Sequence, residues 1–317
     1  MHVATLEPGQ SLGKYTLLRE LGKGSMGVVY FAEDTFLSRN VALKVLSPAL
    51  GVDESFVARF RNEAKSVAAL EHPNILRVHS FDIIDDHLVI DMEYVEGGCL
   101  ATALRTGVLT QSHVIRYARD VLRALAWCHG KGIIHRDVKP TNILVNVAGR
   151  AMLADFGLAK IASHHLAEMS GHGTSPGQFV GTPLYAAPEA WEGEPASPAL
   201  DMYSLGVVMY ECLSGRLPFD GASAISLARQ VMENDVPPVR KVVPDVPKEL
   251  SDLIRDMTRR DPAKRLSDAC EALRRIEAIP LGDKAEAARA PRVPGKPPVW
   301  SSPRPERRRA QLGWTTI

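Results

Sequence analysis

The sequence has few cysteines, no long apolar run and almost no net charge, and each of these shortages argues against a class of protein. Its four cysteines, spread from Cys99 to Cys270, form no Cys-x-x-Cys pair. This spacing speaks against a disulfide framework or a zinc site and suits a reducing compartment. No stretch approaches the roughly 18 apolar residues of a membrane helix, and the first ten residues lack the features of a signal peptide. We therefore expect a cytoplasmic chain without a membrane span.

The charges nearly cancel, with 38 Lys and Arg against 37 Asp and Glu. The net charge of +1 gives no reason to expect nucleic acid or a membrane surface as a partner. The composition changes at about Pro280, and residues 290–317 contain six basic residues and one acidic residue. We predict a disordered basic tail at 280–317, either a solvated linker or a segment that contacts acidic partners.

Short strand-like runs dominate the first hundred residues. They are rich in β-branched and aliphatic side chains and lie at 15–21, 28–32, 41–46, 75–81 and 88–92. One helix is predicted at 53–70, where Phe56, Phe60 and Val67 share a face. Beyond Gly97, periodic apolar residues predict helices at 111–130, 200–213, 222–233, 248–258 and 267–278. The pattern predicts an α+β protein with a small sheet-rich lobe and a larger helical lobe.

Three glycines, Gly22, Gly24 and Gly27, lie between two predicted strands in LGKGSMGVVY. Because glycine has no Cβ, its amides can approach phosphate oxygens closely, although such a triple alone is at least as often a flexible hairpin. Lys44 lies within an apolar strand, where an unpaired ammonium would be costly. Glu63 shares the apolar face of the predicted helix. Each could be a surface charge, but together they predict a Lys44–Glu63 ion pair that directs the lysine toward nucleotide phosphates.

Further motifs occur in the predicted helical lobe. HRDVKPTN at 135–142 places His, Arg, Asp, Lys and Asn within eight residues, a set that a plain polar turn rarely needs. DFG at 155–157 directly follows apolar residues, although an Asp-Gly hairpin turn would look the same. APE follows at 187–189.

With these motifs in this order, the sequence from Tyr15 to about Ile279 resembles the protein-kinase superfamily, and especially the bacterial eukaryotic-like (Hanks-type) serine/threonine kinases. Lys139 and Thr182 match the pattern of Ser/Thr rather than Tyr kinases. The resemblance implies the bilobal kinase fold and transfer of the γ-phosphoryl group of Mg-ATP to Ser or Thr hydroxyls of protein substrates. It divides the chain into a lead at 1–14, a kinase domain at 15–279 with lobes at 15–95 and 96–279, and the tail at 280–317.

The resemblance also implies catalytic roles. Asp137 would orient the substrate hydroxyl and accept its proton, and Lys139 would steady the transferring phosphoryl group. Lys44, paired with Glu63, would hold the α and β phosphates of ATP. Asp201 could be a simple helix N-cap, but by resemblance it anchors the HRD loop.

By the same resemblance, Asn142 and Asp155 would supply oxygen ligands to Mg²⁺. Met92 would close the back of the adenine pocket, and Cys99 would face the ribose at a position that is often polar or acidic in relatives. Arg265 could be a solvated charge, but by resemblance it pairs with Glu189. The implied ATP-binding set is Leu21, Gly22, Lys23, Gly24, Ser25, Gly27, Val29, Ala42, Lys44, Met92, Glu93, Val95, Cys99, Asn142, Leu144 and Asp155, with Glu93 and Val95 acting through their backbones.

The segment between DFG and APE contains several hydroxyl groups and is expected to be a regulatory loop. A phosphate group on this loop could accept bidentate hydrogen bonds from the guanidinium of Arg136. We predict autophosphorylation, with Thr174 or Ser175 favoured, through a transient homodimer. The alternatives are a pseudokinase scaffold, which would usually lack the Lys, the HRD Asp or the DFG Asp, and a small-molecule kinase of related fold, which the APE segment counts against.

Overall fold

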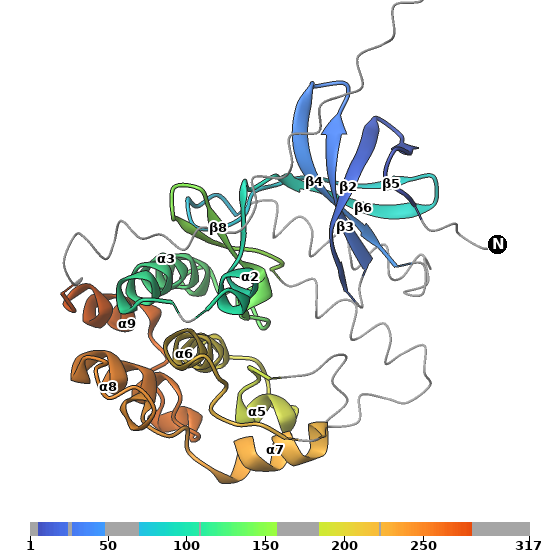
Figure 1. The fold of residues 1–317 in the computed structure, drawn as a ribbon. Coiled ribbons are helices and arrows are strands. Elements are labelled where there is room, and N and C mark those ends of the chain that lie inside the picture. Colours follow the sequence, from blue (N-terminus) through green and yellow to red (C-terminus); the bar gives the residue numbers. More distant parts are fainter. Residues whose placement is uncertain are drawn as a thin grey trace, which may run out of the picture.

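The computed structural model of the chain has two lobes (Figure 1). It describes residues 6–24, 27–47, 70–107, 109–156, 184–221 and 223–280. Within these ranges the small lobe contains a six-stranded antiparallel sheet with the strand order β1-β2-β3-β4-β6-β5. Its strands are β1 (Ser11–Leu12), β2 (Tyr15–Gly24), β3 (Gly27–Asp34), β4 (Arg39–Leu46), β5 (Val78–Ile84) and β6 (His87–Glu93).

Strand β4 determines which side chains face the other lobe. Its last six residues are all buried, and side chains along a strand alternate between the two faces of the sheet. Val41, Leu43 and Val45 belong to the apolar cluster on one face. Ala42 belongs to a second apolar cluster, which includes Ala154 from the large lobe. Lys44 is two residues beyond Ala42 in the strand, so its side chain lies on the same face as that of Ala42, which is directed toward the large lobe.

The large lobe has a second, three-stranded sheet and is otherwise helical. The strands β7 (Gly97–Cys99), β8 (Ile143–Asn146) and β9 (Ala151–Leu153) pair in that order and lie beside the junction with the small lobe (Figure 1). The helices are α2 (Leu100–Arg105), α3 (Gln111–His129), α5 (Pro188–Trp191), α6 (Pro198–Ser214), α7 (Ala224–Glu233), α8 (Lys248–Met257) and α9 (Ala269–Glu277). Short 3-10 helices are η2 (Pro140–Asn142), η3 (Val239–Lys241) and η4 (Pro262–Lys264).

Helix α6 lies at the centre of the large lobe, between α3 and α8 (Figure 1). Nearly all of its residues are buried, as expected of a helix that is apolar on all sides. It ends at Gly215, whose φ of 71° is readily adopted by glycine. Thr110 is the N-cap of helix α3, and its side chain accepts a hydrogen bond from the His113 amide and so satisfies one free N–H of the first turn.

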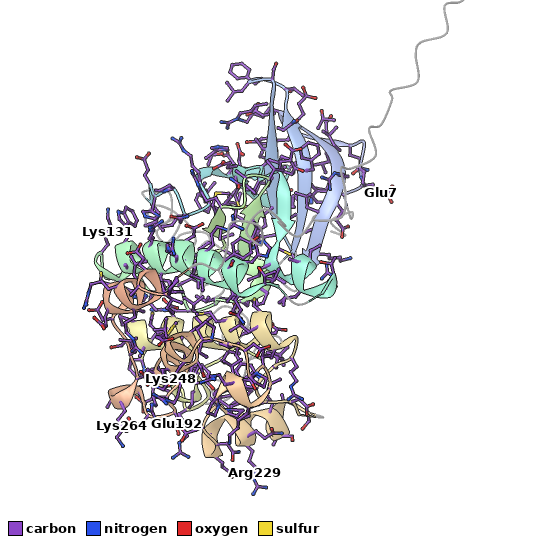
Figure 2. All side chains as sticks on the ribbon, turned by 60° about the vertical axis from the view of Figure 1, so that its left-hand side comes forward. Glu7, Lys131, Glu192, Arg229, Lys248 and Lys264 are labelled. Atoms are coloured by element: carbon purple, nitrogen blue, oxygen red, sulfur yellow. The ribbon has the colours of Figure 1, made fainter. Side chains whose placement is uncertain are left out.

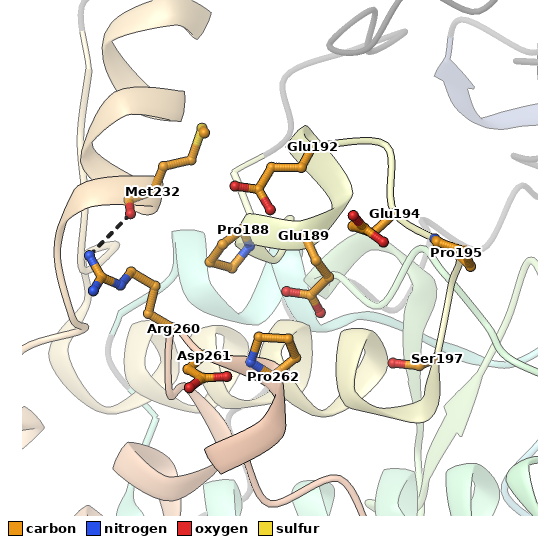
Figure 3. A pocket seen from close by; sticks show the side chains of 10 residues that line it. All are labelled: Pro188, Glu189, Glu192, Glu194, Pro195, Ser197, Met232, Arg260, Asp261 and Pro262. Atoms are coloured by element: carbon orange, nitrogen blue, oxygen red, sulfur yellow. Dashed lines mark hydrogen bonds between the residues drawn. The ribbon is translucent and has the colours of Figure 1, made fainter.

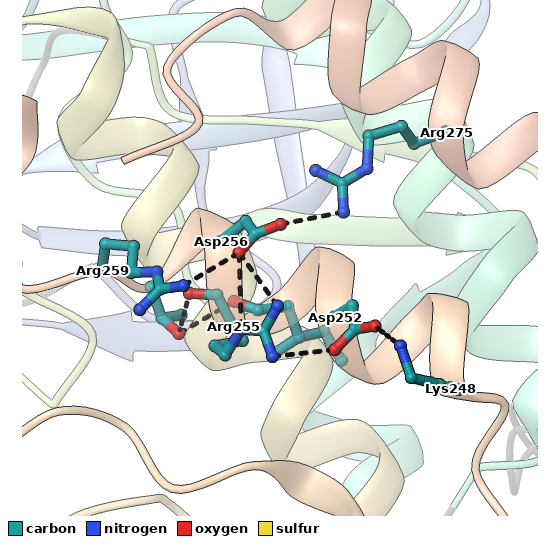
Figure 4. A network of polar contacts seen from close by, with 8 residues as sticks. Lys248, Asp252, Arg255, Asp256, Arg259 and Arg275 are labelled. Atoms are coloured by element: carbon teal, nitrogen blue, oxygen red, sulfur yellow. Dashed lines mark hydrogen bonds and ion pairs between the residues drawn. The ribbon is translucent and has the colours of Figure 1, made fainter. Parts of the chain in front are cut away.

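A network of ion pairs covers the outer side of α8 and ties it to α9 (Figure 4). Asp256 joins the two helices, because its carboxylate lies 3.0 Å from the Arg275 guanidinium on α9. Other pairs connect neighbouring turns of α8, such as Lys248 with Asp252 at 2.6 Å. The members are Lys248, Asp252, Arg255, Asp256, Arg259 and Arg275. Exposed pairs of this kind contribute roughly 0.2–1 kcal/mol each to stability. The network therefore orients the side chains on this surface but adds little to the stability that the buried core provides.

The structure confirms the α+β class and the two lobes. It corrects the predicted strand at 75–81, because β5 begins only at Val78. Ile75 forms an isolated bridge with Leu153, and the Leu76 amide donates to the Leu153 carbonyl, so this segment follows the large lobe's sheet before it enters the small lobe. The predicted helix at 53–70 falls outside the described residues except for Leu70, and the predicted tail does so beyond Pro280. None of the described helices is long and apolar enough to span a membrane.

Candidate active site

An ion pair between Lys44 and Asp155 joins the two lobes. Lys44 Nζ on β4 lies 2.8 Å from Asp155 Oδ1, and the lysine side chain is only 7% exposed. The strand position explains this geometry, because alternation turns Lys44 toward the large lobe. Asp155 follows β9 with a φ of 63°, a left-handed conformation that short polar residues tolerate better than most. The predicted partner Glu63 lies outside the described residues.

The loop after Arg136 brings two polar side chains, Lys139 and Asn142, to Asp137. Lys139 Nζ lies 2.8 Å from Asp137 Oδ2. Asn142 Nδ2 donates to the same carboxylate oxygen at 3.0 Å and to the Asp137 carbonyl at 2.9 Å. The Asp137 carboxylate is therefore held in one orientation while remaining 28% exposed, which leaves it accessible to a substrate.

Asp201 holds the backbone of this loop through hydrogen bonds to its carboxylate. Its Oδ2 accepts a hydrogen bond from the His135 amide at 2.8 Å, and its Oδ1 accepts one from the Arg136 amide at 2.7 Å. His129 Nε2 lies 2.8 Å from Oδ2 as well. The side chain of Asp201 is fully buried. Two directed bonds to successive amides fix a loop in which Arg136 has a φ of 70°. The alternative that Asp201 is a helix N-cap is wrong, because the N-cap of α6 is Ser197 and Asp201 lies within the first turn.

His135 connects the HRD loop to the segment that contains Asp155. The Asp137 amide donates to His135 Nδ1 at 3.2 Å, so this ring nitrogen must be the acceptor. The proton therefore lies on Nε2, which donates to the Ala154 carbonyl at 2.8 Å. The imidazole also packs edge-on against the Phe156 ring, with 4.4 Å between ring centroids. Sequence reasoning did not predict this role, because it depends on contacts between segments about twenty residues apart.

The residues predicted to enclose the adenine come together in one apolar cluster. This cluster contains buried residues from β4, β6 and the segment after β9, with partly buried neighbours from β3, the hinge and β8. Five predicted binding residues belong to it: Val29, Ala42, Met92, Val95 and Leu144. The Glu93 amide already donates to the Arg77 carbonyl at 2.9 Å, so only its carbonyl could pair with a ligand.

The glycine-rich segment forms the end of the β2–β3 hairpin. Leu21, Lys23 and the first two glycines are exposed, and Ser25 lies outside the described residues. A Cβ added at Gly22 or Gly24 would meet nothing within 4 Å, whereas one at Gly27 would lie 2.1 Å from the Val45 carbonyl oxygen. The packing of β3 on β4 therefore requires glycine at position 27 but not at the other two positions.

Cys99 lies at the start of α2, at the end of β7. It pairs with Leu144 across the small sheet, next to the apolar cluster. The thiol is partly exposed, and its Sγ lies 3.4 Å from Thr102 Oγ1. The structure thus places Cys99 beside the predicted nucleotide pocket, with a hydroxyl as its neighbour.

A buried ion pair braces the APE segment against the helices below it. Arg265 donates to both carboxylate oxygens of Glu189, at 2.5 and 2.9 Å, and also to the carbonyls of Ala199, Arg259 and Arg260. The predicted pair is therefore present, and its charges are well satisfied. A pocket of about 550 Å³ lies beside Glu189 (Figure 3). It contains none of the predicted catalytic residues, so we do not identify it with the active site.

Two predicted metal ligands lie on adjacent backbone segments. The Ala154 amide donates to the Asn142 carbonyl at 2.8 Å, which brings Asn142 near Asp155. The Asn142 amide group donates to Asp137, and its Oδ1, which accepts a long bond of 3.4 Å from Thr141 Oγ1, has a second lone pair that makes it a candidate ligand. Among the described residues no cluster of three or more His, Cys, Asp and Glu side chains could hold a metal alone. One carboxylate and one amide oxygen fit Mg²⁺, which usually takes few protein ligands together with phosphates and water.

Comparison with known families agrees with this geometry. The family described as "Protein kinase domain" matches residues 15–276. This chain belongs to the protein kinase domain family.

The chain is also similar to individual bacterial kinases. It is 37% identical over 258 residues to the serine/threonine-protein kinase PrkC of Bacillus subtilis, covering 81% of this chain and 39% of PrkC. It is 38% identical over 291 residues to the serine/threonine-protein kinase PknA of Mycobacterium tuberculosis, covering 90% of this chain and 63% of PknA. The matched region thus covers 39% of the length of PrkC and 63% of the length of PknA.

Solved structures show the same fold. The crystal structure of the Mycobacterium tuberculosis PknI kinase domain matches with a TM-score of 0.67 and 28% identity, covering 86% of this chain and 99% of that one. A structure of Rad53 in complex with AMP-PNP matches with a TM-score of 0.68 and 27% identity, covering 84% of this chain and 66% of that one.

Proposed function

We propose that the chain is a serine/threonine protein kinase that transfers the γ-phosphoryl group of Mg-ATP to Ser or Thr hydroxyls of protein substrates. The observation that carries the proposal is the arrangement around Asp137, which is bonded to Lys139 and Asn142 and linked through His135 to the segment of Asp155. The names of PrkC and PknA support the Ser/Thr class. Residues 15–279 would form the catalytic domain.

The apolar cluster would bind the adenine, and charged residues would bind the phosphates. Apolar side chains from both lobes suit an aromatic base, and the backbone groups of Glu93 and Val95 would pair with its edge. Lys44, buried and directed to the large lobe, would contact the α and β phosphates. A phosphate near Gly22 and Gly24 would meet backbone amides without an intervening side chain. The AMP-PNP complex of Rad53 supports nucleotide binding by this fold.

Asn142 and Asp155 would hold Mg²⁺, which when bound neutralises developing charge on the phosphates. Each offers a hard oxygen, the ligand type that this ion prefers. The Asp155 carboxylate has a second oxygen besides the one that contacts Lys44, so the lysine and a metal could be bound together.

Asp137 would orient the substrate hydroxyl and accept its proton. Its Oδ2 is fixed by Lys139 and Asn142, and Oδ1 is the oxygen left to receive the hydroxyl proton. Lys139, 38% exposed, could turn from Asp137 to the transferring phosphoryl group and offset its charge. Autophosphorylation through a transient homodimer remains part of the proposal, since the loop between DFG and APE carries the required hydroxyls.

Transfer of ³²P from [γ-³²P]ATP to a generic protein such as casein tests the proposal. We expect Asp137→Asn, Lys44→Met and Asp155→Asn each to lower turnover by about 10²-fold or more, because each removes a charge used in the transition state. Asp86→Asn, an exposed aspartate with a positive φ like that of Asp155, should retain full activity. Melting curves must accompany the kinetics.

Three results would contradict the proposal. Undiminished transfer by Asp137→Asn would remove that residue's role. No transfer by the folded parent protein, with or without nucleotide binding, would favour a pseudokinase. Transfer to small hydroxyl compounds but not to proteins would favour a small-molecule kinase.

A further inference from the structure

Four arginines lie together on the outer side of α3, away from every residue of the predicted active site. Arg116, Arg119 and Arg123 recur at spacings of three and four, which places them on one face of the helix. Arg150 joins them from the turn between β8 and β9. We call these four residues the arginine stripe.

Contacts on both sides locate the stripe between that turn and α9. At one end, the Arg116 guanidinium lies against the turn, since a Cβ at Gly149 would be only 3.3 Å from Arg116 Nη1. At the other end, Arg123 Nη2 lies 2.7 Å from Glu277 on α9. Arg119, Arg123 and Arg150 all act electrostatically on Asp120, which lies among them.

Most of this positive charge has no carboxylate partner in the described part of the chain, although the Arg116 guanidinium lies 5.6 Å from the centroid of the Tyr117 ring. Arg123 pairs with Glu277 and lies 3.7 Å from Asp120. The described residues provide no ion pair for Arg116, Arg119 or Arg150. The stripe therefore presents four guanidinium groups with two carboxylates nearby.

Two of the unpaired donors are also buried. Arg116 Nη2 and Arg119 Nε are almost inaccessible to solvent and have no hydrogen-bond acceptor. A buried N–H without an acceptor costs about 1–3 kcal/mol. Because these two atoms are inaccessible, a ligand at the surface would bind the other N–H groups of the same guanidiniums. Asp120 cannot serve all four arginines, because its side chain is only 12% exposed and its Oδ2 already accepts from the Ala151 amide at 3.0 Å.

We propose that the arginine stripe is a docking surface for an acidic segment, a run of Asp and Glu residues, of a partner protein. Guanidinium groups bind carboxylates with two parallel bonds, so a row of arginines suits a row of acidic side chains. The Cα atoms of Arg116 and Arg123 are about 10 Å apart along the helix axis. Alternate side chains of an extended peptide are about 7 Å apart, so three to five acidic residues would span the stripe.

A peptide is favoured over nucleic acid because the rings near the stripe are buried or already in contact with other side chains, whereas single-stranded nucleic acid binds best where bases stack on aromatic side chains. Tyr117 is 4% exposed. Trp127, one turn beyond Arg123, is partly buried, with Lys131 Nζ 4.0 Å from its ring centroid and the His72 ring 5.9 Å away. Docking here goes beyond the proposed function, since none of the arginines takes part in nucleotide binding or phosphoryl transfer. Its test can therefore be done without ATP.

Binding of a fluorescein-labelled octaglutamate peptide, followed by fluorescence anisotropy at low salt, tests the proposal. We expect the parent protein to bind it and Arg116→Glu/Arg119→Glu to weaken binding at least about tenfold, because attraction becomes repulsion. The matched control Arg229→Glu/Lys264→Glu makes the same change in net charge. Figure 2 shows both control residues at the far end of the large lobe from α3, and this variant should bind much as the parent does.

Two further variants guard against misfolding. Arg150→Glu changes an exposed turn residue and should weaken binding by a smaller factor. Asp120→Asn removes the carboxylate among the arginines but keeps an oxygen for the Ala151 amide, so it should strengthen binding. Melting curves verify that each variant is folded.

The proposal is overturned if the parent does not bind the peptide, or if the stripe and control variants lose affinity equally. It is also overturned if Asp120→Asn weakens binding while remaining folded. Tighter binding of a labelled oligothymidylate of eight nucleotides than of octaglutamate, lost in the stripe variant, would assign the surface to nucleic acid instead.

Discussion

Asp201 controls the geometry of the candidate active site without reaching the substrate position. It is fully buried, and its two oxygens accept hydrogen bonds from successive amides of the loop that carries Asp137. The left-handed conformation of Arg136 is unfavourable for a side chain with a Cβ, so the loop needs such directed support. Asp201 is therefore a positioning residue.

The variant Asp201→Asn tests this role. An amide retains one acceptor oxygen, and its NH₂ group would face an N–H, so one of the two loop bonds is lost. A displacement of about 1 Å can cost roughly 10²-fold in rate, and we expect kcat to fall by that order while the KM for ATP changes little. Steady-state kinetics measure both values.

Thr258→Val serves as the control for Asp201→Asn. It removes the buried bond from Thr258 Oγ1 to the Ile254 carbonyl at 2.8 Å, at the C-terminal end of α8, and Thr258 has no hydrogen bond to the loop among the described residues. Its effect should be confined to stability. Equal losses of kcat in the two variants, or a rise in KM alone for Asp201→Asn, would contradict the positioning role.

Several residues of the candidate site were predictable, because they belong to short sequence motifs. Lys44 stands in an apolar strand and Asp137 in a polar run that is unusual for a plain turn, whereas Asp155 could be predicted only from the order of the motifs around it. The contacts of His129 and His135 were not predictable, since a histidine in a helix or loop has no local signal for its partner. The pairing of Lys44 with Asp155 joins residues 111 apart and depends on how the lobes meet.

Cys99 should react with a nucleotide-directed acrylamide, and Mg-ATP should protect it. It is partly exposed beside the apolar cluster, whereas Cys128 and Cys212 are buried and Cys270 is exposed elsewhere. Burial raises the pKa of the Cys128 thiol to about 12, so that thiol is not expected to compete. Mg-ATP at about ten times its Kd should slow labelling of Cys99 about tenfold, because only nucleotide-free molecules react.

Peptide mapping after brief labelling measures each cysteine separately. Cys270 is the internal control, and its labelling should be indifferent to nucleotide. If Cys99 labelled at the same rate with and without Mg-ATP, it would lie outside the nucleotide pocket.

At the scale of elements, the periodic helices and the longer strands within the described residues were predicted well, whereas the strands of two or three residues were not. The predicted helix at 111–130 matches α3 to within one residue, because its apolar face repeats over five turns. The strands β7 and β9 have three residues each, too few to show alternation. Their sheet joins Gly97 with Asn146, a pairing with no local signal.

The turn between β3 and β4 depends on Asp34, which gives a prediction about pH. Asp34 Oδ1 accepts from the amides of Phe36 and Leu37, both at 3.1 Å, and Lys14 Nζ lies 3.0 Å from Oδ2. Burial alone would raise the pKa of Asp34, but the bonds from Lys14 and the two amides outweigh it, so the pKa lies below the ordinary value of 3.8.

A carboxylate with a lowered pKa in the folded state stabilises the protein above its unfolded pKa and loses that effect as the pH falls through its folded pKa. We therefore expect Asp34→Asn to be less stable than the parent at pH 7, and the difference to shrink below about pH 4. Urea unfolding at several pH values measures it. The exposed control Asp245→Asn should show a smaller difference, and a gap that widened in acid would contradict the prediction.

At the scale of the whole molecule, the two lobes meet around Lys44, Asp155 and the apolar cluster. The cluster draws residues from both lobes, and the ion pair crosses between them. A ligand bound there would contact both lobes at once. Its binding should therefore be visible in the stability of the entire domain.

Mg-ATP should raise the melting temperature, and the Mg²⁺-dependent part of the rise should require Asp155. At about 100 times its Kd a ligand stabilises the folded state by about 2.7 kcal/mol, which corresponds to roughly 5–10 °C for a domain of this size. Asp155→Asn removes the carboxylate, yet asparagine tolerates the positive φ at this position, so the backbone should be kept. This variant should give the same small shift with ATP whether Mg²⁺ or EDTA is present.

Asp86→Asn, also at a positive φ but in an exposed turn, should retain the full Mg²⁺-dependent shift. Because Asp155→Asn also leaves Lys44 without its described partner, each variant must be compared with its own ligand-free melting temperature. A full Mg²⁺-dependent shift in Asp155→Asn would show that the metal is held elsewhere.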